Sequence, residues 1–177
     1  MLFRSDDGHI QWIEHPAGRA IDVVALPLKN TGSDVAVYPL SLALSETDMV
    51  PQVAMPVSII GFPYGIATGT GLPIWKTDHI ASEPDVDFDG RPAFLIDATT
   101  RAGMSGSPVV LRLLGGYHTK SGALMMGASS PRTKLLGLYS GRIHGDAELG
   151  RVWRPYLITE ILGQTTDPGL TSVSLWR

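Results

Sequence analysis

The sequence contains no cysteine, so disulfides and thiolate chemistry are excluded. It also lacks any run of lysine or arginine, and its formal net charge is -3 at pH 7, which argues against an electrostatic surface for nucleic acid or membrane. No apolar run approaches the roughly 18 residues of a membrane span, and residues 1–7 lack the apolar core of a signal peptide. We expect no nucleic-acid and no membrane partner. The compartment stays open, with the cytoplasm as the default.

Glycine and proline are abundant instead. The 177 residues include 20 glycines and 13 prolines, with 44% hydrophobic and 18% charged residues. This composition favours many turns and short strands over long helices. The length suits one well-buried domain or two small lobes. We therefore expect an all-β protein.

Strand-like segments follow one another at a spacing typical of an antiparallel barrel. We expect strands over residues 21–28, 57–63, 73–82, 93–97, 107–114 and 135–143, and a C-terminal helix that packs on the barrel over residues 152–162. The pattern predicts a turn at Gly115-Gly116 with a loop up to Lys134, and a surface linker over residues 29–54.

Neither a metal site nor a phosphate site is expected. Glu46 and Asp48 lie in the linker without a nearby histidine, which makes them a poor metal site. The glycine-rich loop over residues 65–71 lacks the lysine of a phosphate-binding loop. We expect no cofactor.

The segment Gly103-Met104-Ser105-Gly106-Ser107-Pro108 carries a serine in a small-residue turn that runs into an apolar strand. A serine attacks a carbonyl when a base takes its proton and nearby donors stabilise the oxyanion. Gly103 can adopt a backbone conformation that turns its N–H toward the same point as the N–H of Ser105. We therefore interpret Ser105 as a nucleophile and the two N–H groups as an oxyanion hole. The alternative is an ordinary turn that enters a strand.

Two further features bear on this hypothesis. Asp22 begins a β-branched run and needs a hydrogen-bond partner, either as a cap at a strand edge or as the acid that orients a histidine. Gly137 and Gly141 interrupt a strand, which often marks the close approach of another backbone, such as a peptide substrate. His144 precedes Gly145-Asp146 and is interpreted as a surface turn residue.

These segments, in this order, resemble those of trypsin-like serine peptidases, most closely the bacterial members without cysteine. The likeness covers the chain from Asp22 onward, and the serine loop is its most specific part. The resemblance implies two six-stranded antiparallel barrels with the active site between them. It implies that the second barrel is complete and the first partial, with residues 1–54 a remnant of the first barrel and linker, 55–150 the second barrel, and 151–177 a C-terminal helix and tail.

The resemblance also implies roles for individual residues. Ser105 would be the nucleophile, the N–H groups of Gly103 and Ser105 the oxyanion hole, and Asp22 the acid that orients the base. Tyr139, Ser140 and Gly141 would pair with the substrate backbone as an added strand. Thr99, or a neighbour such as Asp97, would line the floor of the specificity pocket.

One family feature is missing. The family places its catalytic histidine far upstream of the aspartate on a Thr-Ala-Ala-His-like turn, whereas His15 and His9 lie close to Asp22 in the sequence. No catalytic histidine is identified, and the chain resembles a protein that begins inside the first barrel. Loss of one triad member removes most of the triad's contribution, so we expect little or no activity.

Three hypotheses follow for the function. The first is a trypsin-like serine endopeptidase whose histidine-bearing part is missing from this chain. The second is a pseudopeptidase that keeps the cleft as a peptide-binding module. The third is an esterase-like hydrolase that uses His9, His15 or His144 as base, although the serine leads into a strand rather than a helix. The expected partner is a polypeptide, with a homodimer through exposed barrel edges as a further expectation.

Overall fold

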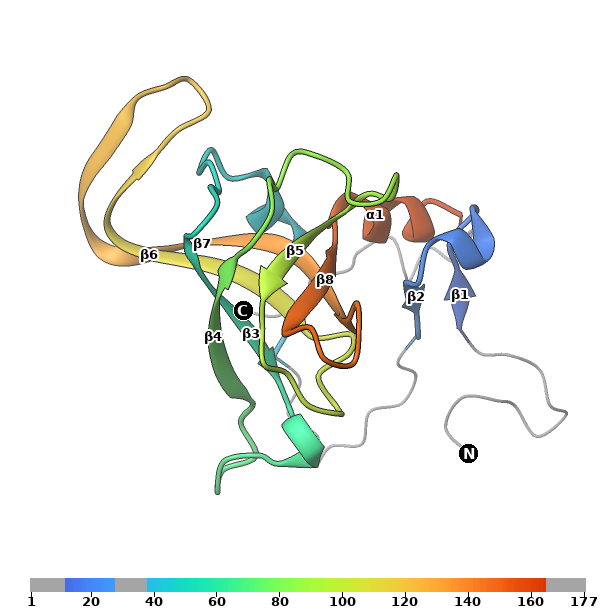
Figure 1. Cartoon of the computed structure of the whole chain (residues 1–177). Coiled ribbons are helices and arrows are strands. Elements are labelled where there is room, and N and C mark those ends of the chain that lie inside the picture. Colours follow the sequence, from blue (N-terminus) through green and yellow to red (C-terminus); the bar gives the residue numbers. More distant parts are fainter. Residues whose placement is uncertain (1–11, 28–37, 165–177) are drawn as a thin grey trace, which may run out of the picture. The chain divides into compact units, whose positions relative to one another are not determined.

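The structure is a computed structural model that describes residues 12–27 and 38–164 (Figure 1). Contacts divide the chain into two compact units. One contains the described residues up to Leu42 together with those from Tyr156 onward, and the other contains Ala43–Pro155.

The second unit contains a closed barrel of six strands. The strands are β3 (Pro56–Gly61), β4 (Ile74–Ile80), β5 (Ala93–Asp97), β6 (Pro108–His118), β7 (Leu124–Arg142) and β8 (Leu149–Trp153). Their order around the barrel is β3-β4-β5-β8-β7-β6, every pair is antiparallel, and β3 closes the barrel against β6 (Figure 1). The expected all-β fold with an antiparallel barrel is confirmed.

The barrel interior is filled by apolar side chains that alternate along the strands, as a strand with one buried face requires. In β3, Val57 and Ile59 are buried, while Ser58 between them is partly exposed. The same core contains these buried residues: Met49, Ile80, Phe94, Ile96, Ala98, Met104, Val109, Leu111, Leu136, Tyr139 and Val152. Met104 belongs to the predicted serine loop, so that loop is attached directly to the core.

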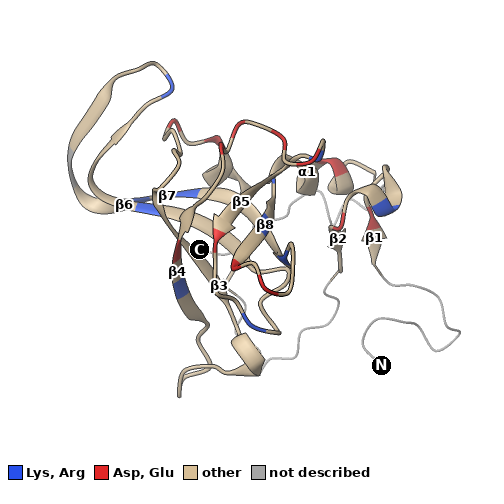
Figure 2. Cartoon of the chain, in the orientation of Figure 1, with Lys and Arg blue, Asp and Glu red and all other residues tan. Residues whose placement is uncertain are grey.

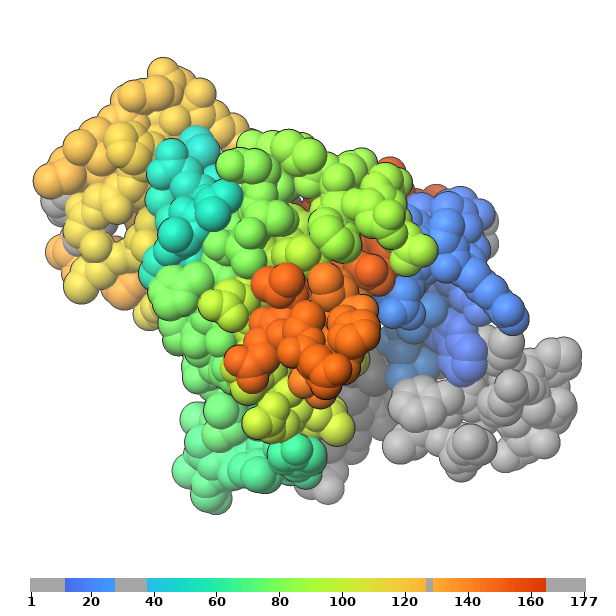
Figure 3. All heavy atoms as spheres, in the orientation of Figure 1, coloured from blue at the N-terminus to red at the C-terminus, as the bar shows by residue number. Residues whose placement is uncertain are grey.

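The prediction of a turn at Gly115-Gly116 followed by a loop is wrong. Strands β6 and β7 instead continue as a two-stranded ribbon, with His118 opposite Leu124 (Figure 1). The strand pairing shifts register around Gly115, which has φ +97°. A β-bulge accommodates a residue with positive φ, so the two glycines do not end the strand. The ribbon, yellow to orange, projects from the barrel in Figure 3.

Lys134 lies buried at the base of this ribbon. Its Nζ donates hydrogen bonds to the carbonyl oxygens of Ser45 (2.9 Å) and Thr47 (2.6 Å), which attaches the 3₁₀ turn η2 (Leu42–Glu46) to β7. Burial lowers the pKa of Lys134 because desolvation disfavours the ammonium form. Elsewhere on the described chain, acidic and basic residues are interspersed (Figure 2).

The other unit is small. It contains the two-stranded ladder of β1 (Ile13–Glu14) and β2 (Val24–Ala25), the 3₁₀ turn η1 (Gly18–Ala20) and the helix α1 (Tyr156–Leu162). The strand expected over residues 21–28 is therefore only two residues long, and residue 28 lies outside the described residues.

The C-terminal helix is confirmed, but it begins at Tyr156 rather than at Val152. Val152 and Trp153 belong to β8, where they pair with Phe94 and Ala93 of β5.

Only one barrel occurs in the described residues, so the expected pair of barrels is not observed there. No helix of the described residues is long and apolar enough to cross a membrane. The predicted boundaries at residues 54 and 150 remain predictions. The barrel strands themselves extend from Pro56 to Trp153.

Gly137 provides a test of the barrel. A Cβ there would overlap the carbonyl oxygen of Trp153, and Gly137 has φ +150°, so Gly137→Ala should lower the free energy of unfolding by about 3 kcal/mol or more. Urea unfolding followed by tryptophan fluorescence measures the change. The control is Gly145→Ala, because a methyl group added there would meet no atom within 4 Å. Equal stability of the two variants would contradict the close approach of β7 and β8.

Candidate functional site

The loop that carries Ser105 connects β5 to β6 and is held against β7. The N–H of Gly106 donates to the carbonyl oxygen of Tyr139 (2.7 Å), and the N–H of Tyr139 donates to the carbonyl oxygen of Ser107 (2.9 Å). Met104 is fully buried on one side of Ser105, while Ser105 itself is exposed. The loop therefore presents the serine to solvent from a rigid base.

Glycines give the loop its shape. Gly103 has φ +92° and Gly106 has φ +85°, a region that residues with a Cβ rarely adopt. A Cβ on Gly103 would also lie 2.6 Å from the carbonyl oxygen of Phe62. Glycine at position 103 is thus required both by the backbone conformation and by the packing.

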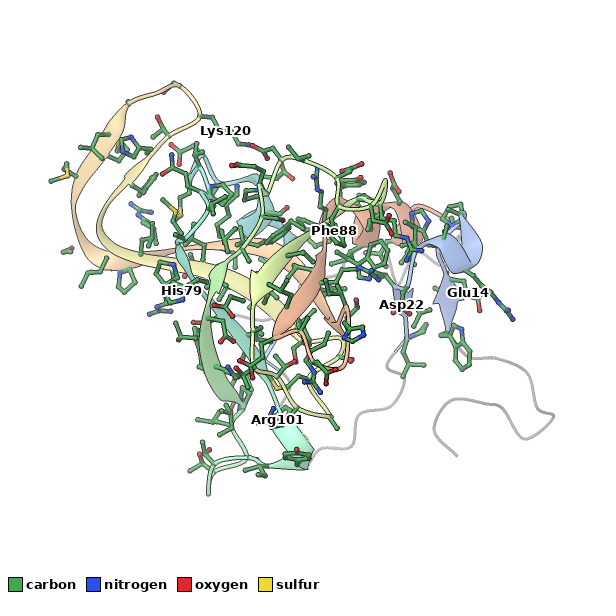
Figure 4. All side chains as sticks on the ribbon, viewed as in Figure 1. Glu14, Asp22, His79, Phe88, Arg101 and Lys120 are labelled. Carbon is green, nitrogen blue, oxygen red and sulfur yellow. The ribbon has the colours of Figure 1, made fainter. Side chains whose placement is uncertain are left out.

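The backbone N–H groups that flank Met104 are free among the described residues. The N–H of Met104 donates to the carbonyl oxygen of Arg101 (3.3 Å), whereas the N–H groups of Gly103 and Ser105 on either side of it have no acceptor there. Figure 4 labels Arg101 in this loop. Unpaired N–H groups beside an exposed serine are the donors that an oxyanion needs.

Strand β7 passes close to the serine hydroxyl. A Cβ on Gly141 would lie 3.7 Å from Ser105 Oγ. Ser140 falls at a register shift, since Tyr139 pairs with Val152 and Gly141 pairs with Arg151 of β8. β-Bulges are frequent next to active sites, where they redirect the chain.

One edge of β7 is open at this point. β6 pairs with β7 only as far as Leu138, so Gly141 and Arg142 pair with β8 on one side alone within the described chain. The backbone groups of Tyr139 are already engaged by Gly106 and Ser107. Ser140 and Gly141, rather than Tyr139, therefore offer the open edge beside Ser105.

The residues expected at the specificity pocket lie on the segment that precedes the serine loop. Thr99 is half-buried, and Asp97 is exposed on β5 opposite His79 of β4. Thr100 is buried, and its Oγ1 shares a hydrogen bond with the hydroxyl of Tyr139. The sequence did not reveal this pair, because a threonine and a tyrosine distant in the sequence give no pattern. Burial raises the pKa of Tyr139 because the phenolate would be desolvated.

Asp22 and His15 belong to the other unit, where Asp22 is exposed (Figure 4). His15 is buried. Its Nδ1 accepts the N–H of Ala17 (3.1 Å), so Nε2 carries the proton and donates to Glu160 Oε2 (2.7 Å). Both ring nitrogens of His15 are thus engaged, which leaves no lone pair for a catalytic base.

The other described histidines do not contact Ser105 either. His144 is exposed in a bend, as expected, and its Nδ1 accepts the N–H of Asp146 (3.2 Å). His79 and His118 are exposed on β4 and β6, and His9 lies outside the described residues. Among residues 12–27 and 38–164, no histidine forms a hydrogen bond with Ser105.

No protein-family model matches the sequence, and no curated protein matches it. The function is therefore inferred from the residues and geometry of the site.

The shape of the loop can be tested at Gly103. We expect Gly103→Ala to abolish reaction of Ser105 with a fluorophosphonate, because the methyl group would displace the Gly103 N–H from its place beside the serine. Intact mass measures the labelled fraction, and circular dichroism checks the fold. Gly69→Ala is the control, since its added methyl group meets no atom within 4 Å. Unchanged labelling of Gly103→Ala would contradict the oxyanion-hole assignment.

The buried pair of Thr100 and Tyr139 gives a pH-dependent prediction. Tyr139→Phe leaves the Thr100 hydroxyl unpaired, which should cost about 1–3 kcal/mol at pH 8. Because folding raises the pKa of Tyr139, the contribution of its hydroxyl is complete below pH 10 and is lost as pH rises through the folded-state value. The difference in urea midpoint between the wild type and Tyr139→Phe should shrink at pH 11. Tyr38→Phe, at an exposed tyrosine, is the control; an equal difference at both pH values would refute the prediction.

Proposed function

We propose that this chain is the nucleophile-bearing part of a trypsin-like serine endopeptidase. The observation that carries the proposal is the pair of free N–H groups, on Gly103 and Ser105, beside an exposed serine on a rigid loop. In the proposed reaction, Ser105 Oγ forms a bond to the carbonyl carbon of the substrate. The peptide C–N bond then breaks, and the serine proton passes through a base to the departing amine.

The open edge of β7 supports a peptide as the substrate. An extended peptide can add to an unpaired strand edge through main-chain hydrogen bonds, which give affinity without a fixed sequence. Ser140 and Gly141 provide such an edge next to Ser105 Oγ. Thr99 would line the pocket for the side chain before the scissile bond, as the resemblance implies, whereas the role of Asp22 as the acid that orients the base remains a prediction from the sequence.

The proposal requires a base that the described residues do not provide. Positioned general bases accelerate such reactions by about 10²–10⁴-fold. No described histidine bonds to Ser105, so we propose that the described residues alone hydrolyse peptides slowly. We propose further that full activity requires the double barrel and the catalytic histidine that the resemblance implies.

The lack of a base beside Ser105 among the described residues favours one alternative. A pseudopeptidase would retain the open edge of β7 and use it only to bind peptides, with Ser105 as a remnant.

The two functions separate in a labelling experiment. We expect a fluorophosphonate to label the wild-type chain slowly, and added imidazole to accelerate the labelling by about tenfold, because imidazole supplies from solution the base that the described residues do not provide, less effectively than a positioned base. Intact mass measures the rate.

Ser105→Ala should abolish the labelling, whereas Ser129→Ala, at an exposed serine of the ribbon, should leave it unchanged. Labelling that persists in Ser105→Ala would contradict the proposed nucleophile. No labelling of the wild type, even with imidazole, would favour the pseudopeptidase.

A further inference from the structure

The turn between β3 and β4, residues 62–72, exposes an unusual set of large apolar side chains, and we call it the apolar turn. Exposed fractions are 42% for Phe62, 66% for Tyr64, 55% for Ile66 and 50% for Leu72. Residues 61–75 include no charged residue. A surface turn of this composition is suited to an uncharged, apolar ligand.

The apolar turn is bonded to the serine loop. The N–H of Tyr64 donates to the carbonyl oxygen of Ala102 (2.7 Å), and the Phe62 carbonyl oxygen is the atom that a Cβ on Gly103 would strike. In Figure 3 the turn and the serine loop lie side by side at the lower end of the barrel. A ligand that reaches the N–H of Gly103 therefore passes beside the apolar turn.

Tyr64 is held in a strained conformation. It has φ +55° within the short 3₁₀ turn η3 (Pro63–Gly65), a region that is an outlier for a bulky residue. Such strain costs of order 1–3 kcal/mol and is concentrated at functional sites. In this strained conformation the large aromatic ring of Tyr64 is exposed next to the serine loop rather than buried.

The serine loop has two different neighbours, the open edge of β7 and the apolar turn. Gly141 of the open edge of β7 lies next to Ser105 Oγ. Two residues before Ser105, Gly103 lies against the apolar turn. A peptide that pairs with β7 before the scissile bond and places its carbonyl at the N–H of Gly103 would leave the residues after that bond free to contact the apolar turn.

We propose that the apolar turn binds apolar side chains on the leaving-group side of the scissile bond, and that the substrates are peptides with apolar residues there. This inference rests on the proposed function, because it uses Ser105 and the edge of β7 as the reference points for the peptide.

Two fluorescein-labelled octapeptides of alanine and lysine test the inference. They are identical except that one has two leucines, and the other two serines, directly after the centre. We expect the full chain to bind the leucine peptide about tenfold more tightly by fluorescence anisotropy, which corresponds to roughly 1.4 kcal/mol. The leucine peptide should also slow the fluorophosphonate labelling of Ser105.

Variants assign the preference to the turn. Ile66→Ser should weaken binding of the leucine peptide by about threefold or more and leave the serine peptide unchanged. Val86→Ser changes an equally exposed apolar residue outside the turn and should change neither affinity. Thermal unfolding checks that both variants fold.

Equal affinity for the two peptides, or no binding of either, would overturn the inference. It would also be overturned if Ile66→Ser converted a dimer to a monomer by light scattering without changing peptide affinity, because the turn would then be an interface between copies. The proposed function fails separately, through the absence of Ser105 labelling, while anisotropy still reports the leucine preference.

Discussion

The reciprocal hydrogen bonds between the serine loop and β7 are the constraint on which the site depends. Tyr139 accepts the N–H of Gly106 and donates its own N–H to Ser107, so the residues directly after Ser105 are fixed to the barrel wall. Met104 secures the preceding side by burial in the core. A loop fastened on both sides can present a hydroxyl and two N–H donors without losing conformational entropy when a ligand binds, which is the physical basis of preorganisation.

The same bonds determine which residues of β7 remain open beside Ser105. By engaging both backbone groups of Tyr139, they shift the first open position on β7 to Ser140, where the bulge brings Gly141 next to the serine. At the start of the serine loop, the lack of a Cβ on Gly103 allows the carbonyl of Phe62 to approach. An edge that can pair with a backbone and a turn that can contact apolar side chains thus both border the serine loop.

The sequence predicted well those features that arise from local pattern. β5 was predicted at its observed bounds, because Ala93–Asp97 is a short apolar run. The ribbon was missed because Gly115-Gly116 has the composition of a turn, and only pairing with β7 keeps the chain extended there. Both glycines of β7 suggested the close approach of another backbone. Gly137 accommodates the backbone of Trp153 of the protein itself, whereas Gly141 lies near Ser105. The sequence did not reveal the exposure of the side chains in the apolar turn, because exposure depends on the tertiary fold.

The central claim is that the N–H groups of Gly103 and Ser105 stabilise an oxyanion, and a crystal structure of the chain with a peptidyl boronic acid tests it most directly. Boron forms a tetrahedral adduct with a serine, and one of its oxygens then stands in for the oxyanion. The account predicts a bond from Ser105 Oγ to boron and one boronate oxygen within about 2.7–3.1 Å of both backbone nitrogens. An adduct whose oxygens all point to solvent, or a boronic acid bound away from Ser105, would contradict the claim.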